Sequence, residues 1–328
     1  MEENTEQRVD LTLFSEKIQE LKDRIASVIV GQEQTVDLVL TAILANGHVL
    51  IEGVPGVAKT LLARLTARLI DADFSRVQFT PDLMPSDVLG TTVFNMKTNG
   101  FDFHQGPIFA DIVLVDEINR APAKTQAALF EVMEERQISI DGTTHRMGDL
   151  YTILATQNPV EQEGTYKLPE AQLDRFLMKI TMDYPSLEEE VNILERHHTN
   201  AALVKLDDIT PAITKEELLS LRAFMNQVFV DRTLLQYIAL IVQQTRTSKA
   251  VYLGASPRAS VAMLQSSKAY ALLQGRDFVT PEDIKFVAPY VLQHRLILTA
   301  EAEMEGYSPV KVTPVSYTHL RAHETKAN

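Results

Sequence analysis

The segment HVLIEGVPGVAKT, His48 to Thr60, decides the fold of this chain. Its opening residues, His48 to Glu52, form a short β-forming run that ends in a glycine-containing turn, and a helical pattern follows from Thr60 to Leu69. In such a strand–loop–helix junction the backbone N–H groups point inward and the helix N-terminus adds partial positive charge, so the loop can bind a polyphosphate. We expect Lys59 to reach the β- and γ-phosphates of a nucleotide and Thr60 to ligate Mg²⁺.

The loop departs from the usual phosphate-binding pattern at one position, where Ala58 stands in place of the glycine before the lysine. Gly53 and Gly56 keep the flexible part, so we expect the loop to form with slightly less conformational freedom. The alternative is a glycine turn that enters a helix with a surface lysine. The stretch predicted to bind the nucleotide is Gly53, Val54, Pro55, Gly56, Val57, Ala58, Lys59, Thr60 and Leu61.

A second motif, IVLVDEINRAP, runs from Ile112 to Pro122. Apolar β-forming residues lead into Asp116 and Glu117, which places two carboxylates at the carboxyl edge of a buried strand, where ligands bind in open α/β sheets. We expect Asp116 to hold the Mg²⁺ shell and Glu117 to orient and deprotonate the attacking water. The alternative is an acidic N-cap for a helix over Lys124–Glu134, but a cap rarely needs two acids after a fully buried strand.

The apolar runs and the helical segments between them predict an α/β fold, in which a parallel five-stranded sheet lies between helices. The strands are expected over His48–Glu52, Arg76–Phe79, Ile112–Val115, Tyr151–Ala155 and Leu177–Thr181. Two helices are expected before the sheet. One follows from the helical spacing of Phe14, Ile18, Leu21, Ile25 and Val28, with Ser15 as its N-cap, and the other covers Leu38–Ala45.

The second half of the chain is predicted to be a smaller all-helical domain. Ser186 with Glu189, and Thr214 with Glu217, form capping boxes that open helices. Thr280 followed by proline is a further helix start. We therefore divide the chain into a nucleotide-binding core over residues 1–184, a helical lid domain over 185–308, and a tail over 309–328 that lacks periodicity and is expected to be disordered or foreign to the natural gene.

Composition narrows the classes of function. Hydrophobic residues make up 45% of the 328 residues, so a sizeable core can form, and no apolar run approaches the ~20 residues that span a bilayer. The chain has no cysteine, which excludes disulfides and thiolate metal sites, and its N-terminus does not resemble a signal peptide. We expect a cytoplasmic protein. The net charge of -13 disfavours a broad electrostatic interaction with nucleic acid.

Two insertions each predict a β-hairpin. The first lies within Met84–Pro107, with Asn99-Gly100 as its turn, and the second is Gln137–Met147, which alternates around Asp141-Gly142. His104 and His145 have no metal-ligand spacing to other histidines, so we expect them to be hairpin surface residues.

Five motifs taken together resemble the AAA+ ATPases, and most closely their MoxR family. They are GVPGVAKT, VDEINRAP, ATQNP (Ala155–Pro159), LPEAQLDRF (Leu168–Phe176) and SPRAS (Ser256–Ser260). The resemblance covers residues from about 10 to 310. It implies an AAA+ core followed by an all-α lid, Mg-dependent hydrolysis of ATP, and hairpins that project toward a ring pore or a client protein.

The resemblance also implies roles for residues outside the first two motifs. Asn158 matches sensor 1, which positions the hydrolytic water beside Glu117. Arg175 matches the arginine finger, which acts on the γ-phosphate of a neighbouring subunit, and Arg258 matches sensor 2, which reaches the γ-phosphate of its own subunit. The segment near the adenine matches Ile29, Val30 and Gly31.

Other readings of these three residues stay open. Arg175 could be a surface ion-pair partner, Arg258 a surface residue at a helix start, and Asn158 part of an Asn-Pro turn. If Arg175 is not the finger, Arg120 after the acidic strand is the next candidate.

A finger that acts across subunits implies a homo-oligomeric ring, usually a hexamer. The family resemblance implies chaperone-like remodelling or maturation of client proteins, often ones with a von Willebrand factor A domain, although nothing in the residues identifies the client. Alternatives on the same fold are a nucleic-acid-associated motor, a magnesium-chelatase-like motor subunit and a nonhydrolysing nucleotide switch. The presence of Glu117, Asn158 and Arg175 argues against the switch.

Overall fold

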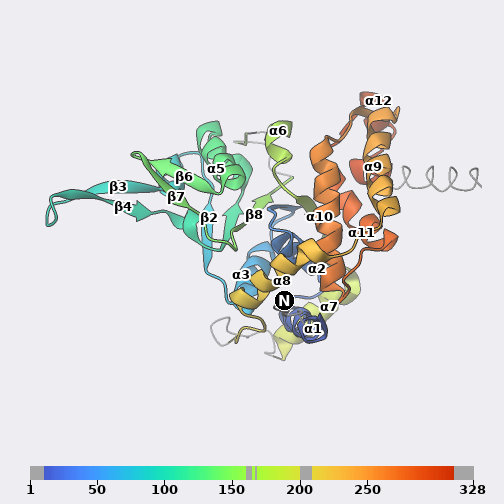
Figure 1. Ribbon diagram of the computed structural model, residues 1–328, viewed down its shortest axis with the longest axis horizontal. Helices are drawn as coiled ribbons and strands as arrows, with labels where there is room; N and C mark the ends of the chain where they lie inside the picture. The colour runs from blue at the N-terminus through green and yellow to red at the C-terminus, as the bar shows by residue number, and fades with distance from the viewer. Residues whose placement is uncertain (1–10, 160–164, 167, 200–208, 314–328) are drawn as a thin grey trace, which may run out of the picture.

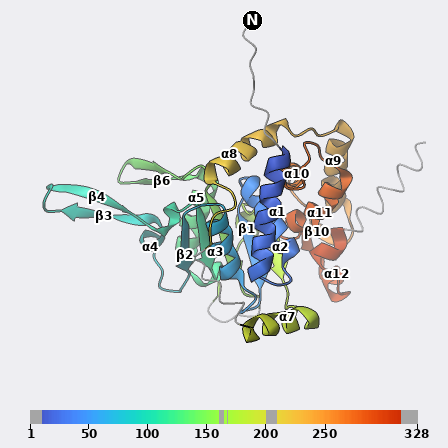
Figure 2. The same cartoon turned by 90° about the horizontal axis from the view of Figure 1, so that it is seen from below.

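The computed structural model describes residues 11–159, 165–166, 168–199 and 209–313. An α/β core carries two hairpins that project from one side, and lid helices lie on the other side (Figures 1 and 2). No helix within these ranges is long and apolar enough to cross a membrane.

The core is built on a five-stranded sheet in the order β2-β5-β8-β1-β9, with every neighbouring pair parallel. The strands are β1 (Val49–Gly53), β2 (Phe74–Gln78), β5 (Ile112–Asp116), β8 (Thr152–Gln157) and β9 (Met178–Met182). All five were expected within one or two residues of these bounds, so the predicted parallel sheet is confirmed.

Helices cover both faces of the sheet (Figure 1). Alternate residues of β5 enter two separate apolar layers: Ile112 and Leu114 pack with α1 to α3 and the lid, whereas Val113 and Val115 pack with α5 and the hairpin roots. The core helices are α1 (Leu11–Val28), α2 (Glu33–Leu44), α3 (Lys59–Leu69), α4 (Pro85–Leu89), α5 (Ala123–Glu135) and α6 (Glu170–Leu173).

The predicted N-cap of the first helix is wrong. Helix α1 already includes Leu11, so Ser15 lies inside it, next to the buried Phe14. The apolar spacing located the helix correctly, but a serine can occupy an interior turn as well as a cap, and the pattern alone did not decide between them.

The hairpins are β3 (Gly90–Asn95) with β4 (Gly100–Gln105), and β6 (Gln137–Ile140) with β7 (Thr143–Arg146). The second turn is as predicted, since Asp141 and Gly142 both have positive φ, at 50° and 79°. The first turn is wider than predicted: Asn95 pairs with Gly100, so the loop spans residues 96–99 and Asn99 takes its left-handed last position, with φ 52°.

The lid contains α7 (Leu187–His198), α8 (Lys215–Phe224), α9 (Arg232–Thr247), α10 (Pro257–Leu273), α11 (Pro281–Leu292) and α12 (Ala300–Met304). Both predicted capping boxes form, at Ser186 and at Thr214, and a third forms between Thr280 and Asp283. The lid also holds one small antiparallel pair, β10 (Val251–Leu253) with β11 (Ile297–Leu298), which the all-helical prediction omitted.

The predicted tail begins inside a folded segment. Residues 309–313 are helical, and Val312 packs with Leu298 and Ala302 in a small apolar cluster. These residues therefore belong to the lid, and the rest of the predicted tail, 314–328, lies outside the described residues.

His48, at the amino end of β1, is buried and must be neutral. The Ile153 N–H donates to Nδ1 at 3.0 Å, and Nε2 donates to the Met133 carbonyl at 3.1 Å. Burial, with the nearby Arg136 charge as a smaller cause, lowers the pKa of His48 to about 3. Protonation of Nδ1 would remove the acceptor that Ile153 needs.

We predict that acid weakens the fold through His48. Below pH 6.5 the unfolded chain takes up a proton that the folded chain refuses until about pH 3. The free energy of unfolding therefore falls as the pH falls through this window, by about 1.4 kcal/mol per pH unit for this residue. In urea denaturation at pH 7, 6 and 5, His48→Gln should lose stability with a shallower slope than the wild type, while His104→Gln on the exposed hairpin keeps the wild-type slope. Equal slopes for all three proteins would contradict the assignment.

Candidate nucleotide-hydrolysis site

The loop after β1 has the backbone geometry of a phosphate cradle. Gly56 has φ 89°, and a Cβ added there would meet no heavy atom within 4 Å, so the space beside the loop is open. Ala58, the residue that departs from the usual pattern, precedes α3 with φ 60°, a left-handed conformation that explains why glycine is usual here. Lys59 Nζ donates to the Gly53 carbonyl at 2.5 Å, which holds the ammonium group beside the loop.

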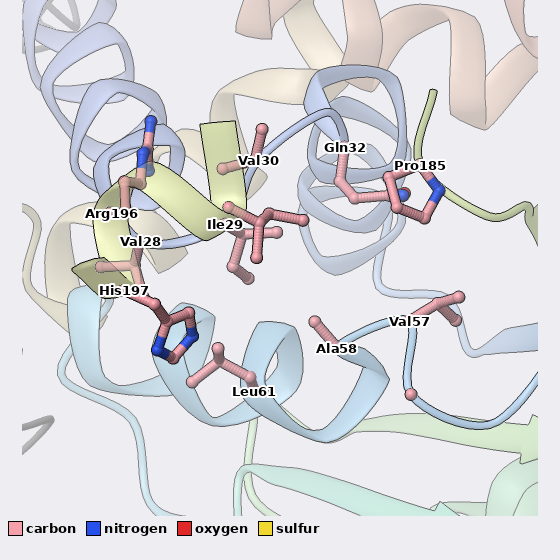
Figure 3. A pocket seen from close by; sticks show the side chains of 12 residues that line it. Val28, Ile29, Val30, Gln32, Val57, Ala58, Leu61, Pro185, Arg196 and His197 are labelled. Atoms are coloured by element: carbon pink, nitrogen blue, oxygen red, sulfur yellow. The ribbon is translucent and has the colours of Figure 1, made fainter. Parts of the chain in front are cut away.

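A cavity of about 220 Å³ adjoins the loop and is suited to the flat ring of a nucleotide base such as adenine (Figure 3). The segment between α1 and α2 contributes Ile29 and Val30, and α7 contributes Ile193, Arg196 and His197. Its remaining lining residues are Val28, Gln32, Gly56, Val57, Ala58, Leu61 and Pro185. Thus the predicted adenine segment does lie against the phosphate loop.

Helix α7 is held over this cavity by two contacts. Arg196 Nη1 donates to the carbonyls of Ala26 and Ser27 at the end of α1, at 3.1 and 2.8 Å. Gly31, with φ 73°, lies so close to Glu189 that an added Cβ would approach Oε1 to 2.2 Å. Gly31 therefore shapes the turn beneath α7 and does not line the cavity.

Asp116, at the carboxyl end of β5, is buried and has a partner on each oxygen. Thr156 Oγ1 donates to Oδ1 at 3.1 Å, and Arg76 Nε donates to Oδ2 at 2.6 Å. Arg76 supplies a positive charge that offsets the cost of burying this carboxylate.

Glu117 follows in the left-handed conformation, with φ 57°. Its N–H donates to Thr156 Oγ1 at 3.0 Å, so Thr156 positions both acids. Its Oε2 accepts from Gln78 Nε2 at 3.0 Å and lies 3.1 Å from Arg120 Nε. Both of these partners are on Oε2.

Asn158 comes directly after β8 and is buried. Because β8 lies between β5 and β1, Asn158 is at the same sheet edge as Asp116 and the phosphate loop. The structure thus brings the loop, the acidic pair and Asn158 together, as the sequence predicted.

Arg175 and Arg258 lie at the opposite edge of the sheet. The Leu177 N–H donates to the His48 carbonyl before β1, which places Arg175 at the amino edge. Both arginines bind the same carboxylate on α5: Arg175 Nε donates to Glu134 Oε2 at 2.7 Å, and Arg258 Nη2 donates to Oε1 at 3.0 Å.

Arg258 therefore does not lie beside the phosphate loop of its own subunit, where the resemblance placed it. Its partner Glu134 follows Met133, whose carbonyl accepts a hydrogen bond from His48 at the amino end of β1. The phosphate loop begins at Gly53, at the other end of β1, and a strand of this length spans about 17 Å. The motif at Arg258 gave its place on α10 but not the side of the core against which the lid packs.

The oxygen donors at the site fit Mg²⁺. The Thr60 hydroxyl and the Asp116 carboxylate are the hard ligands that this ion prefers. Among the residues that the structure describes, no group of three or more His, Cys, Asp or Glu side chains could hold a metal ion.

Sequence reasoning missed several residues that contact the site. Thr156 stands in the ATQNP motif but was not singled out, and Arg76 and Gln78 carry no motif of their own. Glu134 looks like one acid among several on α5. Only the fold shows that it lies beside both arginines.

Comparison with known families matches two parts of the chain. A profile described as the ATPase family associated with various cellular activities (AAA) matches residues 48–178, and one described as the AAA lid domain matches residues 243–314. The first range contains the loop, the acidic pair, Asn158 and Arg175.

Individual relatives extend the similarity over most of the chain. It is 49% identical to YeaC, an uncharacterized protein of Bacillus subtilis, over 87% of this chain and 88% of that protein. It is 45% identical to the chaperone MoxR1 of Mycobacterium tuberculosis, over 87% of this chain and 77% of that protein. A crystal structure from Cytophaga hutchinsonii, proposed to be an ATPase, matches with a TM-score of 0.86 and 41% identity, covering 94% of this chain and 95% of that one.

We predict that two substitutions separate binding from turnover. If Lys59 contacts the phosphates in the ground state, as the sequence predicts, Lys59→Ala should abolish ATP binding, measured by calorimetry or a fluorescent analogue. Glu117→Gln removes the base that is needed only in the transition state, so it should bind ATP and lose turnover. Hydrolysis by Glu117→Gln at the wild-type rate would show that another group activates the water. Glu135→Gln, on the same helix as Glu134 and away from the loop, is the matched control.

Proposed function

This chain belongs to the MoxR family of AAA+ ATPases, and we propose that it hydrolyses MgATP in a ring of identical subunits to remodel or mature client proteins. The observation that carries the ring is the division of the site. One edge of the sheet holds the phosphate loop, the acidic pair and Asn158, and the other holds Arg175 and Arg258. Because the two edges lie about 17 Å apart, only a second subunit can bring the arginines to the phosphates.

Within one subunit we assign Lys59 to the phosphates, Thr60 and Asp116 to the magnesium shell, Glu117 to deprotonation of the water and Asn158 to its orientation. Thr60 and Asp116 would hold the ion, which when bound would supply positive charge against the charge that develops during transfer. Ile29, Val30 and α7 enclose the base.

Across the interface we assign Arg175 as the finger and Arg258 as its companion, so that both act on the neighbouring subunit. Their shared partner Glu134 supports this pairing, because it holds the two guanidinium groups side by side. Arg120, the other candidate, lies 3.1 Å from Glu117 of its own chain and so belongs to the hydrolytic edge.

The hairpins support a protein client. They project from the same side of the core (Figure 2). Met96 and Phe101 on the first hairpin are 89% and 74% exposed, and Phe94 packs edge-on against Phe101. Exposed apolar side chains suit contact with protein better than with phosphate backbones, which require clustered basic residues. A relative named as a chaperone agrees with this role, and we extend it to clients with a von Willebrand factor A domain.

We predict that complementation will reveal the shared site. Arg175→Ala should bind ATP nearly normally and hydrolyse it about 10³-fold or more slowly, because fingers act on the transition state. Mixed with Lys59→Ala, it should recover part of the activity, since some interfaces then combine an intact loop from one variant with an intact finger from the other.

Co-assembly of the two variants is checked by mass photometry with a nonhydrolysable ATP analogue, which should show growth toward a hexamer. If co-assembled mixtures give only the sum of the two residual rates, Arg175 does not act across subunits. A protein that stays monomeric with the analogue at high micromolar concentration would exclude the ring.

We predict that the first hairpin contacts the client. Glu117→Gln should retain clients in the ATP-bound state, and the same variant with Met96→Ser and Phe101→Ser should lose them while binding the analogue equally well. The measurement is a pull-down with each variant, in which the retained proteins are identified by mass spectrometry and compared with those retained by Lys59→Ala. Retention of nucleic acid in place of protein would favour the motor hypothesis.

A further inference from the structure

We propose that Arg295 is a positioning residue for Arg175: it ties the main chain around Arg175 to the lid of the same subunit, so that the lid sets where the finger is presented. The proposal rests on the cross-subunit role of Arg175 given above.

Arg295 follows α11 and is almost fully buried, with its side chain 4% exposed. Its Nε donates to Asp174 Oδ1 at 2.6 Å. Its Nη2 donates to the carbonyls of Asp174 and Phe176 at 3.1 and 2.7 Å, and its Nη1 donates to the Leu177 carbonyl at 3.1 Å. One guanidinium group therefore holds the backbone on both sides of Arg175.

Neighbouring residues of the lid contact the same part of the core. Gln293 Nε2 donates to the Lys179 carbonyl and His294 Nε2 to the Phe176 carbonyl. Lys179 belongs to β9, the edge strand of the sheet, and Phe176 lies just before it. The residues that follow α11 therefore bind the chain where it leaves Arg175 and enters the sheet.

Asp174 connects a second lid helix to the same segment. Ser256 Oγ donates to Asp174 Oδ2 at 3.4 Å, and Arg258 Nη1 lies 3.9 Å from the same oxygen. The start of α10 and the segment after α11 therefore both contact the carboxylate of Asp174, next to Arg175. A shift of the lid would move Arg175 and Arg258 together.

The side chain of Arg175 is held much less firmly than its backbone. Its partner Glu134 is 38% exposed, and the Arg175 guanidinium also lies 5.9 Å from the centre of the Phe130 ring. Exposed ion pairs are weak, whereas a buried arginine with its donors satisfied is costly to displace. The backbone is fixed by Arg295 while the guanidinium can exchange Glu134 for a phosphate oxygen of the neighbour.

The test uses Arg295→Lys in the full-length protein. Lysine keeps the charge but lacks the planar fork, so it cannot bond Asp174 and the two flanking carbonyls at once. We expect kcat to fall on the order of 10- to 100-fold, since a displacement of about 1 Å has this effect, while ATP affinity stays near that of the wild type. Arg276→Lys is the matched control: Arg276 forms a bidentate pair with Asp283 inside the lid and should leave kcat near the wild-type value.

Mixing experiments separate positioning from a general loss of structure. If Arg295 positions the finger, Arg295→Lys should be rescued by Lys59→Ala subunits, which carry an intact finger, and not by Arg175→Ala subunits, which lack one. The opposite pattern would place the defect in the variant's own ATP site and overturn the proposal, as would an unchanged kcat. Asp174→Asn, which removes the carboxylate from Arg295, should behave as Arg295→Lys does and serves as the second variant if the lysine protein fails to fold.

The mixture of Arg175→Ala with Lys59→Ala shows whether a negative result concerns Arg295 alone or the cross-subunit role of Arg175 as well. If that mixture is rescued and the Arg295→Lys mixture is not, only the positioning role falls. If neither is rescued despite co-assembly, the finger does not act across subunits and both proposals fall.

Discussion

The direction of the strands constrains everything else in this structure. All five strands of the sheet are parallel, so their carboxyl ends meet at one edge and their amino ends at the other. The phosphate loop, Asp116 and Asn158 each follow a strand and must lie at the first edge. Arg175 precedes β9 and must lie at the second. No side-chain movement within one chain closes this gap, because a side chain spans only a fraction of a strand's length.

Helix α5 joins the two edges. It starts a few residues after Glu117 and ends at Glu135, so Glu134, the partner of both arginines, lies at the end of α5 that is far from Glu117. The hairpin β6–β7 follows α5 directly. Helix α5 thus connects the backbone after the acidic pair to Glu134 and to the second hairpin.

Local chemistry made most of the site predictable from the sequence. The loop, the acidic pair and Asn158 each follow a β-forming run, and a strand that ends in polar residues fixes where those residues lie. The errors concern non-local choices. Arg258 was recognised, but the face against which the lid packs depends on contacts such as Arg295 with Asp174, which join residues 121 positions apart. The predicted positions of Ser15 in its helix and of Asn99 in its turn were wrong by a few residues. Each residue type suits more than one position there, and packing decided between them.

The strength of the Glu134 pairs explains how two arginines can rest at one carboxylate and still serve catalysis. A hydrogen bond from Arg175 lowers the pKa of Glu134, so Glu134 stays charged at neutral pH, but it is too exposed for either pair to exceed about 1 kcal/mol. A finger that accelerates hydrolysis 10³- to 10⁵-fold supplies about 4–7 kcal/mol in the transition state. On the proposed assignment, the exchange from Glu134 to phosphate would be strongly favoured only as charge develops on the transferring group. Glu134 would then hold the arginines in place between turnovers, and its release would add little to the barrier.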